Sequence, residues 1–143
     1  LITISNQSKV VLPIHPRTKK KLHAIEHEKL LMKIYESKNL FLIPPVSFLD
    51  MIQLEKNSRL IITDSGGVQK ESYFFNKPCI VLRPETEWVE ILSTGKAKLV
   101  SADYKKILLA FDIFINLDES EFPKILGDGR AAEFICETLI RNS

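Results

Sequence analysis

Short, continuous runs of apolar residues alternate along the chain with longer stretches in which apolar residues recur every three to four positions. The continuous runs are typical of strands buried on both faces of a parallel sheet, and the longer spacing is typical of helices. We predict strands at residues 10–14, 40–43, 60–63, 79–82 and 98–100. We predict helices at residues 22–37, 47–55, 68–75, 87–93, 103–115 and 130–140, and a polar loop at 117–122. Ser47 and Thr86 are the expected N-caps of the helices at 47–55 and 87–93. The alternation indicates a Rossmann-like α/β fold, with about five parallel strands flanked by helices.

The residues that follow each predicted strand are the candidates for function. In parallel α/β sheets, ligands bind outside the carboxyl ends of the strands. This rule selects His15, residues 44–47, residues 64–67 and residues 83–87. A ligand site is expected where these segments meet.

Composition limits the class of protein. The 143 residues suit one ordinary domain, and 45% apolar with 27% charged residues excludes collagen-like, coiled-coil and disordered chains. The net charge is +2, without the basic surplus that is typical of a nucleic-acid-binding protein. No apolar run is long enough to span a membrane, and we expect a cytoplasmic protein. Cys79 and Cys136 lie in apolar patterns and are expected to be buried. Because the chain starts at Leu1, we expect a piece of a longer protein.

The segment Asp64-Ser65-Gly66-Gly67 lies between a predicted strand and a predicted helix. Adjacent glycines let the backbone approach a ligand closely or adopt positive φ, and a helix N-terminus offers free N–H groups to a diphosphate. The segment matches neither dinucleotide fingerprint nor P-loop, so neither NAD nor ATP is implied. A tight turn with Asp64 or Ser65 as helix cap is an equally good interpretation.

Three further residues have two interpretations each. Glu71 can accept hydrogen bonds from vicinal ribose hydroxyls, or it can be a solvated helix residue. Arg83 can clamp a phosphate, or it can pair with Glu85 or Glu87. His15 can contact a ligand at the carboxyl ends of the strands, or it can be a structural hydrogen-bonding group.

Other polar features carry less weight. His23 and His27 are four residues apart, which suits a metal, but no third ligand is visible and a solvated helix face is expected. The basic segment 17–21 contains no aromatic residue and is expected to be a solvated helix start. Ser65 has no evident base, which disfavours a serine hydrolase, and Trp88 is expected to be partly buried.

Four segments occur together in one order: LPIHPRT at 12–18, TDSGGVQKE at 63–71, LRPETEWVE at 82–90 and GDGRA at 127–131. In combination they resemble the C-terminal half of the non-hydrolysing UDP-N-acetylglucosamine 2-epimerases, over residues 9–140. The resemblance implies that residues 1–143 form one Rossmann-like domain of a glycosyltransferase-B-type architecture, with the nucleotide sugar bound between two domains. It also implies a homodimeric full-length enzyme of polysaccharide biosynthesis.

The resemblance implies that the enzyme interconverts UDP-GlcNAc and UDP-ManNAc by eliminating and re-adding UDP, with neither metal nor other cofactor. It further implies a role for each residue that matches the family motifs. Ser65, Gly66 and Gly67 would hold the diphosphate, Glu71 the ribose and Arg83 the phosphates. Val46 and Met51 would contact uracil, and His15 would lie on the cleft side.

Departures from the family pattern leave the substrate open. The acid and base carboxylates of the family lie in the N-terminal domain, so the catalytic residues are unknown and this part is expected to be inactive alone. Lys70 and Trp88 resemble a branch that includes 2-epimerases of UDP-2,3-diacetamido-glucuronate. A glycosyltransferase of the same fold and a non-catalytic UDP-sugar binding module are further alternatives.

Overall fold

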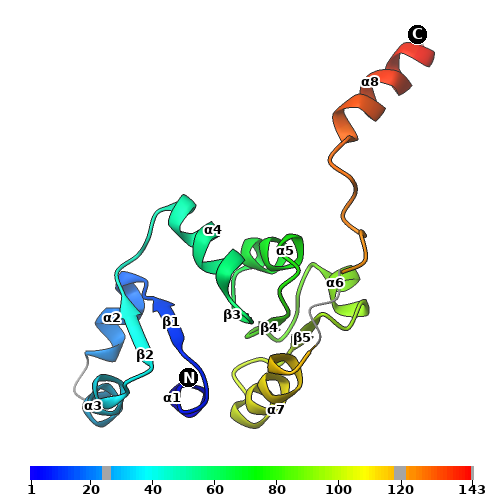
Figure 1. Cartoon of the computed structure of the whole chain (residues 1–143). Coiled ribbons are helices and arrows are strands. Elements are labelled where there is room, and N and C mark those ends of the chain that lie inside the picture. Colours follow the sequence, from blue (N-terminus) through cyan, green and yellow to red (C-terminus); the bar gives the residue numbers. More distant parts are fainter. Residues whose placement is uncertain (24–26, 118–121, 143) are drawn as a thin grey trace. The chain divides into compact units, whose positions relative to one another are not determined.

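A computed structural model describes residues 1–23, 27–117 and 122–142. The chain divides into two compact units, Leu1–Ser58 and Arg59–Ser143. Helices and strands alternate within each of them (Figure 1). The alternation predicted from the hydrophobic pattern is therefore confirmed.

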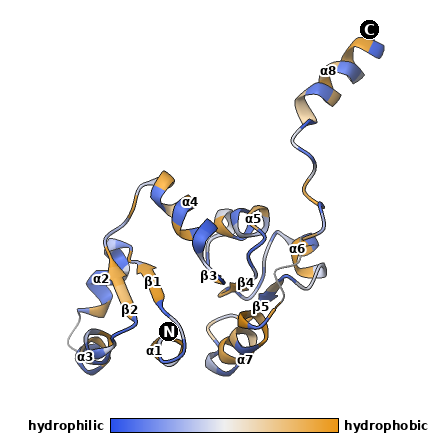
Figure 2. Ribbon diagram, viewed as in Figure 1, coloured by the Kyte–Doolittle hydropathy of each residue, from blue (hydrophilic) through white to orange (hydrophobic). Residues whose placement is uncertain are grey.

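The first unit is built on two parallel strands. Its elements are α1 (Ile2–Ser5), β1 (Val10–Pro13), α2 (Pro16–Leu22), α3 (Glu28–Glu36), β2 (Leu40–Ile43) and α4 (Phe48–Asn57). The strands β1 and β2 pair in register from Val10 with Leu40 to Pro13 with Ile43. Both are strongly hydrophobic (Figure 2).

The helix predicted at 22–37 differs from the structure. Leu22 ends α2, a helix that starts directly after His15, and the second helix begins only at Glu28. Proline is favoured in the first turn of a helix because its N–H is not needed there, and Pro16 occupies that position. Residues 24–26 of the predicted helix lie outside the described residues.

The second unit is a three-stranded parallel sheet with helices around it. Its elements are β3 (Ile61–Thr63), α5 (Gly66–Phe74), β4 (Cys79–Val81), α6 (Val89–Ser93), β5 (Ala97–Leu99), α7 (Tyr104–Ile115) and α8 (Ala131–Arg141). The strand order is β3-β4-β5, so β4 is central. Ile80 and Val81 point to opposite faces of β4 and both are fully buried, so both faces are covered. In Figure 1, α5 and α7 lie on opposite sides of this sheet.

The five predicted strands are present and every pair of neighbours is parallel, as expected. They form two hydrogen-bonded sheets, β1-β2 and β3-β4-β5, one in each unit. Within the residues that the structure describes, no strand pairs with the second edge of β1 or of β3. A hydrophobic pattern identifies strands but does not specify which of them become neighbours.

The core of the second unit joins the sheet to the segment after α7. Ile61, Val81 and Ile91 are among its buried residues, together with Tyr73 and Phe122, whose ring centres are 5.3 Å apart. The Tyr73 hydroxyl donates a hydrogen bond of 2.6 Å to the Pro123 carbonyl. The loop predicted at 117–122 falls partly on residues 118–121, which lie outside the described residues.

The two cysteines have different environments. Cys79 is buried in β4 as expected, whereas Cys136 is exposed, and the prediction for it was wrong. Cys136 lies in α8, which has the predicted alternation of apolar and polar residues (Figure 2) but contains no buried residue. An apolar stripe shows which side of a helix could be covered, but it does not show that anything covers it.

Replacing Ile80 by alanine removes most of a fully buried side chain from the central strand. We expect the free energy of unfolding to fall by about 2–5 kcal/mol, because the cavity adds to the lost burial. Denaturant unfolding measures this change. Ile113→Ala on α7 is the matched control, because Ile113 is 46% exposed, and its effect should stay within about 0.5 kcal/mol. Equal effects of the two variants would contradict the buried position of β4.

Candidate functional site

The ends of β3 and β4 place two candidate residues side by side. Thr63 pairs with Val81 in the parallel register, and the Leu82 N–H donates to the Thr63 carbonyl at 2.8 Å. Ser65 lies two residues after Thr63, and Arg83 lies two residues after Val81. The turn after β3 and the loop after β4 therefore begin at the same edge of the sheet, as the rule for parallel sheets predicts.

The turn after β3 leads directly into α5. Ser65 is the N-cap, with φ −84° and ψ 127°, and its hydroxyl accepts a hydrogen bond of 3.5 Å from the Val68 N–H. Ser65, rather than Asp64, is therefore the cap, a choice that the sequence left open. The helix begins at Gly66, two residues before its predicted start. Gly66 and Gly67 thus lie in the first turn, where backbone N–H groups lack partners within the helix and the positive end of the helix dipole attracts anions.

Close approach, rather than positive φ, explains the first of the two glycines. Neither Gly66 nor Gly67 has a positive φ. A Cβ added to Gly66 would collide with Oε1 of Glu87 and lie 3.6 Å from Nη1 of Arg83. A Cβ on Gly67 would meet only the Ser65 hydroxyl, at 3.8 Å. Gly66 therefore leaves room for the end of the Glu87 side chain, and Gly67 leaves the first turn of α5 open.

Arg83 lies over this first turn and is paired with a carboxylate. Its Nη1 is 3.0 Å from Oε2 of Glu87, and the two side chains are 34% and 49% exposed. The sequence offered Glu85 or Glu87 as partners, and the structure selects Glu87. An ion pair this exposed contributes at most about 1 kcal/mol, so an incoming anion can compete for the guanidinium.

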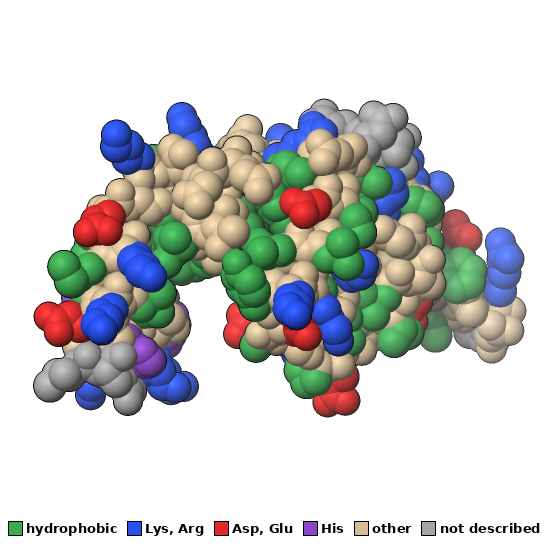
Figure 3. All heavy atoms as spheres, turned by 90° about the horizontal axis from the view of Figure 1, so that it is seen from below, with side chains coloured by type: hydrophobic (Ala, Val, Ile, Leu, Met, Phe, Trp, Pro, Cys, Tyr) green, Lys and Arg blue, Asp and Glu red, His purple; other side chains and the backbone are tan. Residues whose placement is uncertain are grey.

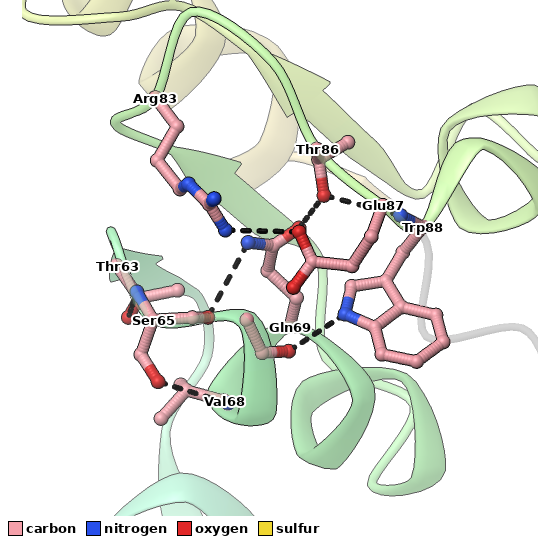
Figure 4. A network of polar contacts seen from close by, with 9 residues as sticks. Thr63, Ser65, Val68, Gln69, Arg83, Thr86, Glu87 and Trp88 are labelled. Atoms are coloured by element: carbon pink, nitrogen blue, oxygen red, sulfur yellow. Dashed lines mark hydrogen bonds and ion pairs between the residues drawn. The ribbon is translucent and has the colours of Figure 1, made fainter.

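The Gln69 side chain connects the turn after β3 to the loop after β4 through two hydrogen bonds (Figure 4). Its Nε2 donates to the Ser65 carbonyl at 3.3 Å, and its Oε1 accepts from the Thr86 hydroxyl at 2.6 Å. Gln69 is buried, with 2% of its surface exposed. Both ends of the amide are satisfied, so the network holds Ser65 and Arg83 in a fixed relation. Sequence reasoning missed this residue, although its position one turn after Ser65 within the motif was a usable signal.

Trp88 makes a second connection to α5. Its indole N–H donates to the Gly66 carbonyl at 2.9 Å, and the Lys70 ammonium lies 4.5 Å from the ring centre. Trp88 is partly buried, as expected. Thr86 was predicted to cap a helix starting at Glu87. Instead its hydroxyl accepts from the Trp88 N–H, and the helix begins at Val89 without a side-chain cap.

Glu71 lies one helical turn after Gly67, which places it on the same face of α5, about 6 Å further along the axis. It is partly buried. A ligand that binds the first turn of α5 through one end can therefore reach Glu71 with its other end. This placement fits the ribose interpretation without excluding a solvated glutamate.

Three predicted residues belong to the first unit, which the structure describes by itself. The His15 side chain is exposed and its Nδ1 accepts from the Arg17 N–H at 3.2 Å, so it caps α2. Val46 follows β2 and Met51 lies in α4, and both are partly buried. The other predicted residues, Ser65, Gly66, Gly67, Glu71 and Arg83, belong to the second unit, where Arg83 lies beside the first turn of α5.

Three further observations concern the distribution of charge, metal-binding groups and apolar helices in the described part of the chain. Basic and acidic side chains are interspersed on the face drawn in Figure 3. Among the residues described, no three His, Cys, Asp or Glu side chains gather where they could hold a metal ion. None of the described helices combines the length and the apolar character needed to cross a membrane.

Comparisons with known proteins agree with the sequence motifs. A family described as UDP-N-acetylglucosamine 2-epimerase matches residues 1–140. A UDP-N-acetylglucosamine 2-epimerase homolog of Methanococcus maripaludis is 43% identical over 136 residues, covering 95% of this chain and 37% of that protein. The UDP-2,3-diacetamido-2,3-dideoxy-D-glucuronate 2-epimerase of Pseudomonas aeruginosa is 38% identical, covering 95% of this chain and 36% of that protein.

A solved structure shows the same fold. The UDP-GlcNAc 2-epimerase of Methanocaldococcus jannaschii, in complex with UDP-GlcNAc and UDP, matches with a TM-score of 0.79 and 36% identity, over 98% of this chain and 38% of that one. The Rossmann-like α/β prediction is confirmed. The chain spans less than two fifths of the length of these relatives. It belongs to the UDP-N-acetylglucosamine 2-epimerase family.

Proposed function

We propose that this chain is the UDP-binding, C-terminal part of an enzyme that interconverts UDP-GlcNAc and UDP-ManNAc. The observation that carries the proposal is the meeting of Arg83 with the first turn of α5, at Gly66. Family membership and the nucleotide complex of the Methanocaldococcus jannaschii relative support it. By this proposal the full-length enzyme acts as a homodimer in the cytoplasm.

The diphosphate would bind at the start of α5. The N–H groups of Gly66 and Gly67 and the Ser65 hydroxyl supply donors, and Arg83 supplies charge. A helix N-terminus with a guanidinium beside it favours a dianion, since charged hydrogen bonds are roughly twice as strong as neutral ones. Glu71, further along the same helix face, would accept hydrogen bonds from the ribose hydroxyls.

The family resemblance also implies roles for three residues of the first unit. Val46 and Met51 would pack against uracil, and His15 would lie on the side facing the sugar. The role of His15 as a helix cap fits this arrangement, because the bond to Arg17 uses only Nδ1 and leaves Nε2 available.

The contribution of this chain to catalysis would be to stabilise UDP as it leaves. The C2 proton is removed and its electron pair forms the C1–C2 double bond of a 2-acetamidoglucal, while the bond between C1 and the UDP oxygen breaks and UDP carries away that bond's electron pair. Re-addition with the proton returned to the opposite face inverts C2. Donors already aimed at the diphosphate stabilise the charge that develops there. The acid and base would come from the rest of the enzyme.

A second candidate is 2-epimerisation of UDP-2,3-diacetamido-glucuronate. The 38% identity to the Pseudomonas aeruginosa enzyme supports it, and Lys70 and Trp88 are the residues that resemble that branch. Competition between UDP-GlcNAc and the diacetamido-glucuronate for the UDP site would distinguish the two sugars. The one that binds more tightly is the better substrate candidate.

Calorimetric titration of the chain with UDP tests the proposal directly. We expect saturable binding of UDP, with ADP and inorganic phosphate binding more weakly. Equal binding of ADP would contradict a uracil site. A folded sample that binds none of the three would contradict nucleotide binding by this chain.

Arg83→Ala removes the guanidinium from the start of α5. We expect the binding free energy of UDP to weaken by about 1.5–3 kcal/mol, because charged hydrogen bonds are lost. The dissociation constant measured by calorimetry would then rise roughly 10- to 150-fold. Arg141→Ala is the control, since Arg141 pairs with Glu137 within α8 and lies outside the family motifs. Unchanged UDP affinity in Arg83→Ala would remove Arg83 from the site.

Gln69→Leu removes both hydrogen bonds that connect the two loops. We expect a loss of about 1–3 kcal/mol in the free energy of unfolding, because the partly buried Thr86 hydroxyl loses its acceptor and the side-chain bond to the Ser65 carbonyl is lost. UDP affinity should fall as well, because Ser65 and Arg83 are no longer held together. Gln53→Leu, on the exposed side of α4, serves as the control for both measurements. A destabilised variant with unchanged UDP affinity would limit Gln69 to a structural role.

A further inference from the structure

The Glu87 side chain covers the first turn of α5 (Figure 4). Its Oε1 fills the space that a Cβ of Gly66 would take, and its Oε2 accepts a hydrogen bond of 3.0 Å from Arg83 Nη1. The carboxylate therefore lies between the guanidinium and the N-terminal turn of the helix. These are the two groups assigned above to the diphosphate.

Two anions cannot share this position favourably. A carboxylate and a phosphate at contact distance repel each other, and the one available guanidinium can neutralise only part of their combined charge. The diphosphate gains the full benefit of Arg83 and of the helix N-terminus only when the Glu87 carboxylate has moved away. The geometry thus makes Glu87 a competitor of the ligand.

The carboxylate is able to move without unfolding the loop. The Glu87 side chain is 49% exposed, so its terminal atoms can turn into water. The loop itself is held by the neighbouring residues: Thr86 bonds Gln69, and the Trp88 indole bonds the Gly66 carbonyl. A rotamer change at Glu87 alone would open the first turn of α5.

We propose that Glu87 sets the affinity of the site, as an internal carboxylate that pairs with Arg83 and is displaced by the diphosphate. This inference rests on the proposed binding of UDP at the start of α5. It implies that the site discriminates by charge, since a ligand must bring enough negative charge to replace the carboxylate at Arg83.

Calorimetric titration of Glu87→Gln with UDP tests the inference. We expect UDP to bind roughly two- to fivefold more tightly than to the unsubstituted chain, because an exposed pair of this kind competes only modestly. Glu87→Asp keeps the charge but shortens the side chain, so it should also bind UDP more tightly. Glu85→Gln removes a neighbouring exposed carboxylate and serves as the control for net charge, with a smaller effect expected.

The outcomes separate this inference from the proposed function. If the unsubstituted chain binds UDP and Glu87→Gln binds it equally or more weakly, the inference is overturned, and Glu87 instead holds Arg83 in place for the ligand. An equal gain in Glu85→Gln would also overturn it, because the effect would then be one of net charge. If neither the unsubstituted chain nor Glu87→Gln binds UDP while both are folded by circular dichroism, the proposed function fails and this inference fails with it.

Discussion

The candidate site depends on one physical constraint: two neighbouring parallel strands end at the same level, and buried hydrogen bonds hold the segments that follow them together. The pairing of Thr63 with Val81 sets the level. Gln69 then bonds both the Ser65 carbonyl and the Thr86 hydroxyl. Because a buried amide is costly to leave unpaired, this connection favours one arrangement of the two loops.

The same constraint explains why a glycine begins α5. Gly66 leaves room for the carboxylate of Glu87 and brings the Arg83 guanidinium to the helix N-terminus. A larger residue would displace the Glu87 carboxylate from the first turn of α5. The N-terminus of α5 and the Arg83 guanidinium thus lie close together, so that either the Glu87 carboxylate or an anionic ligand can bind there.

Much of the local structure could be predicted because it depends on neighbours in sequence. The strands at 10–14, 40–43 and 79–82 appear within a residue or two, since continuous apolar runs bounded by Pro or Gly are local signals. Ser47 and Asp103 cap the helices that follow them, each by accepting a backbone N–H. In place of the single helix predicted at 22–37, the structure has one helix from Pro16 to Leu22 and another from Glu28. Hydrophobic periodicity alone did not show this division.

The sequence by itself determined the α/β alternation, the residues that follow each strand and the motifs of the family. Those features are read from spacing and residue type along the chain. Only the tertiary structure decided that Ser65 caps α5, that Arg83 pairs with Glu87 rather than Glu85, and that Gln69 connects the two loops. The contact between Gln69 and Thr86 joins residues 17 positions apart, so it depends on the pairing of β3 with β4. The cap and the ion pair join near neighbours in sequence, but the sequence offered two candidates for each, and only the conformation of the folded loops chose between them.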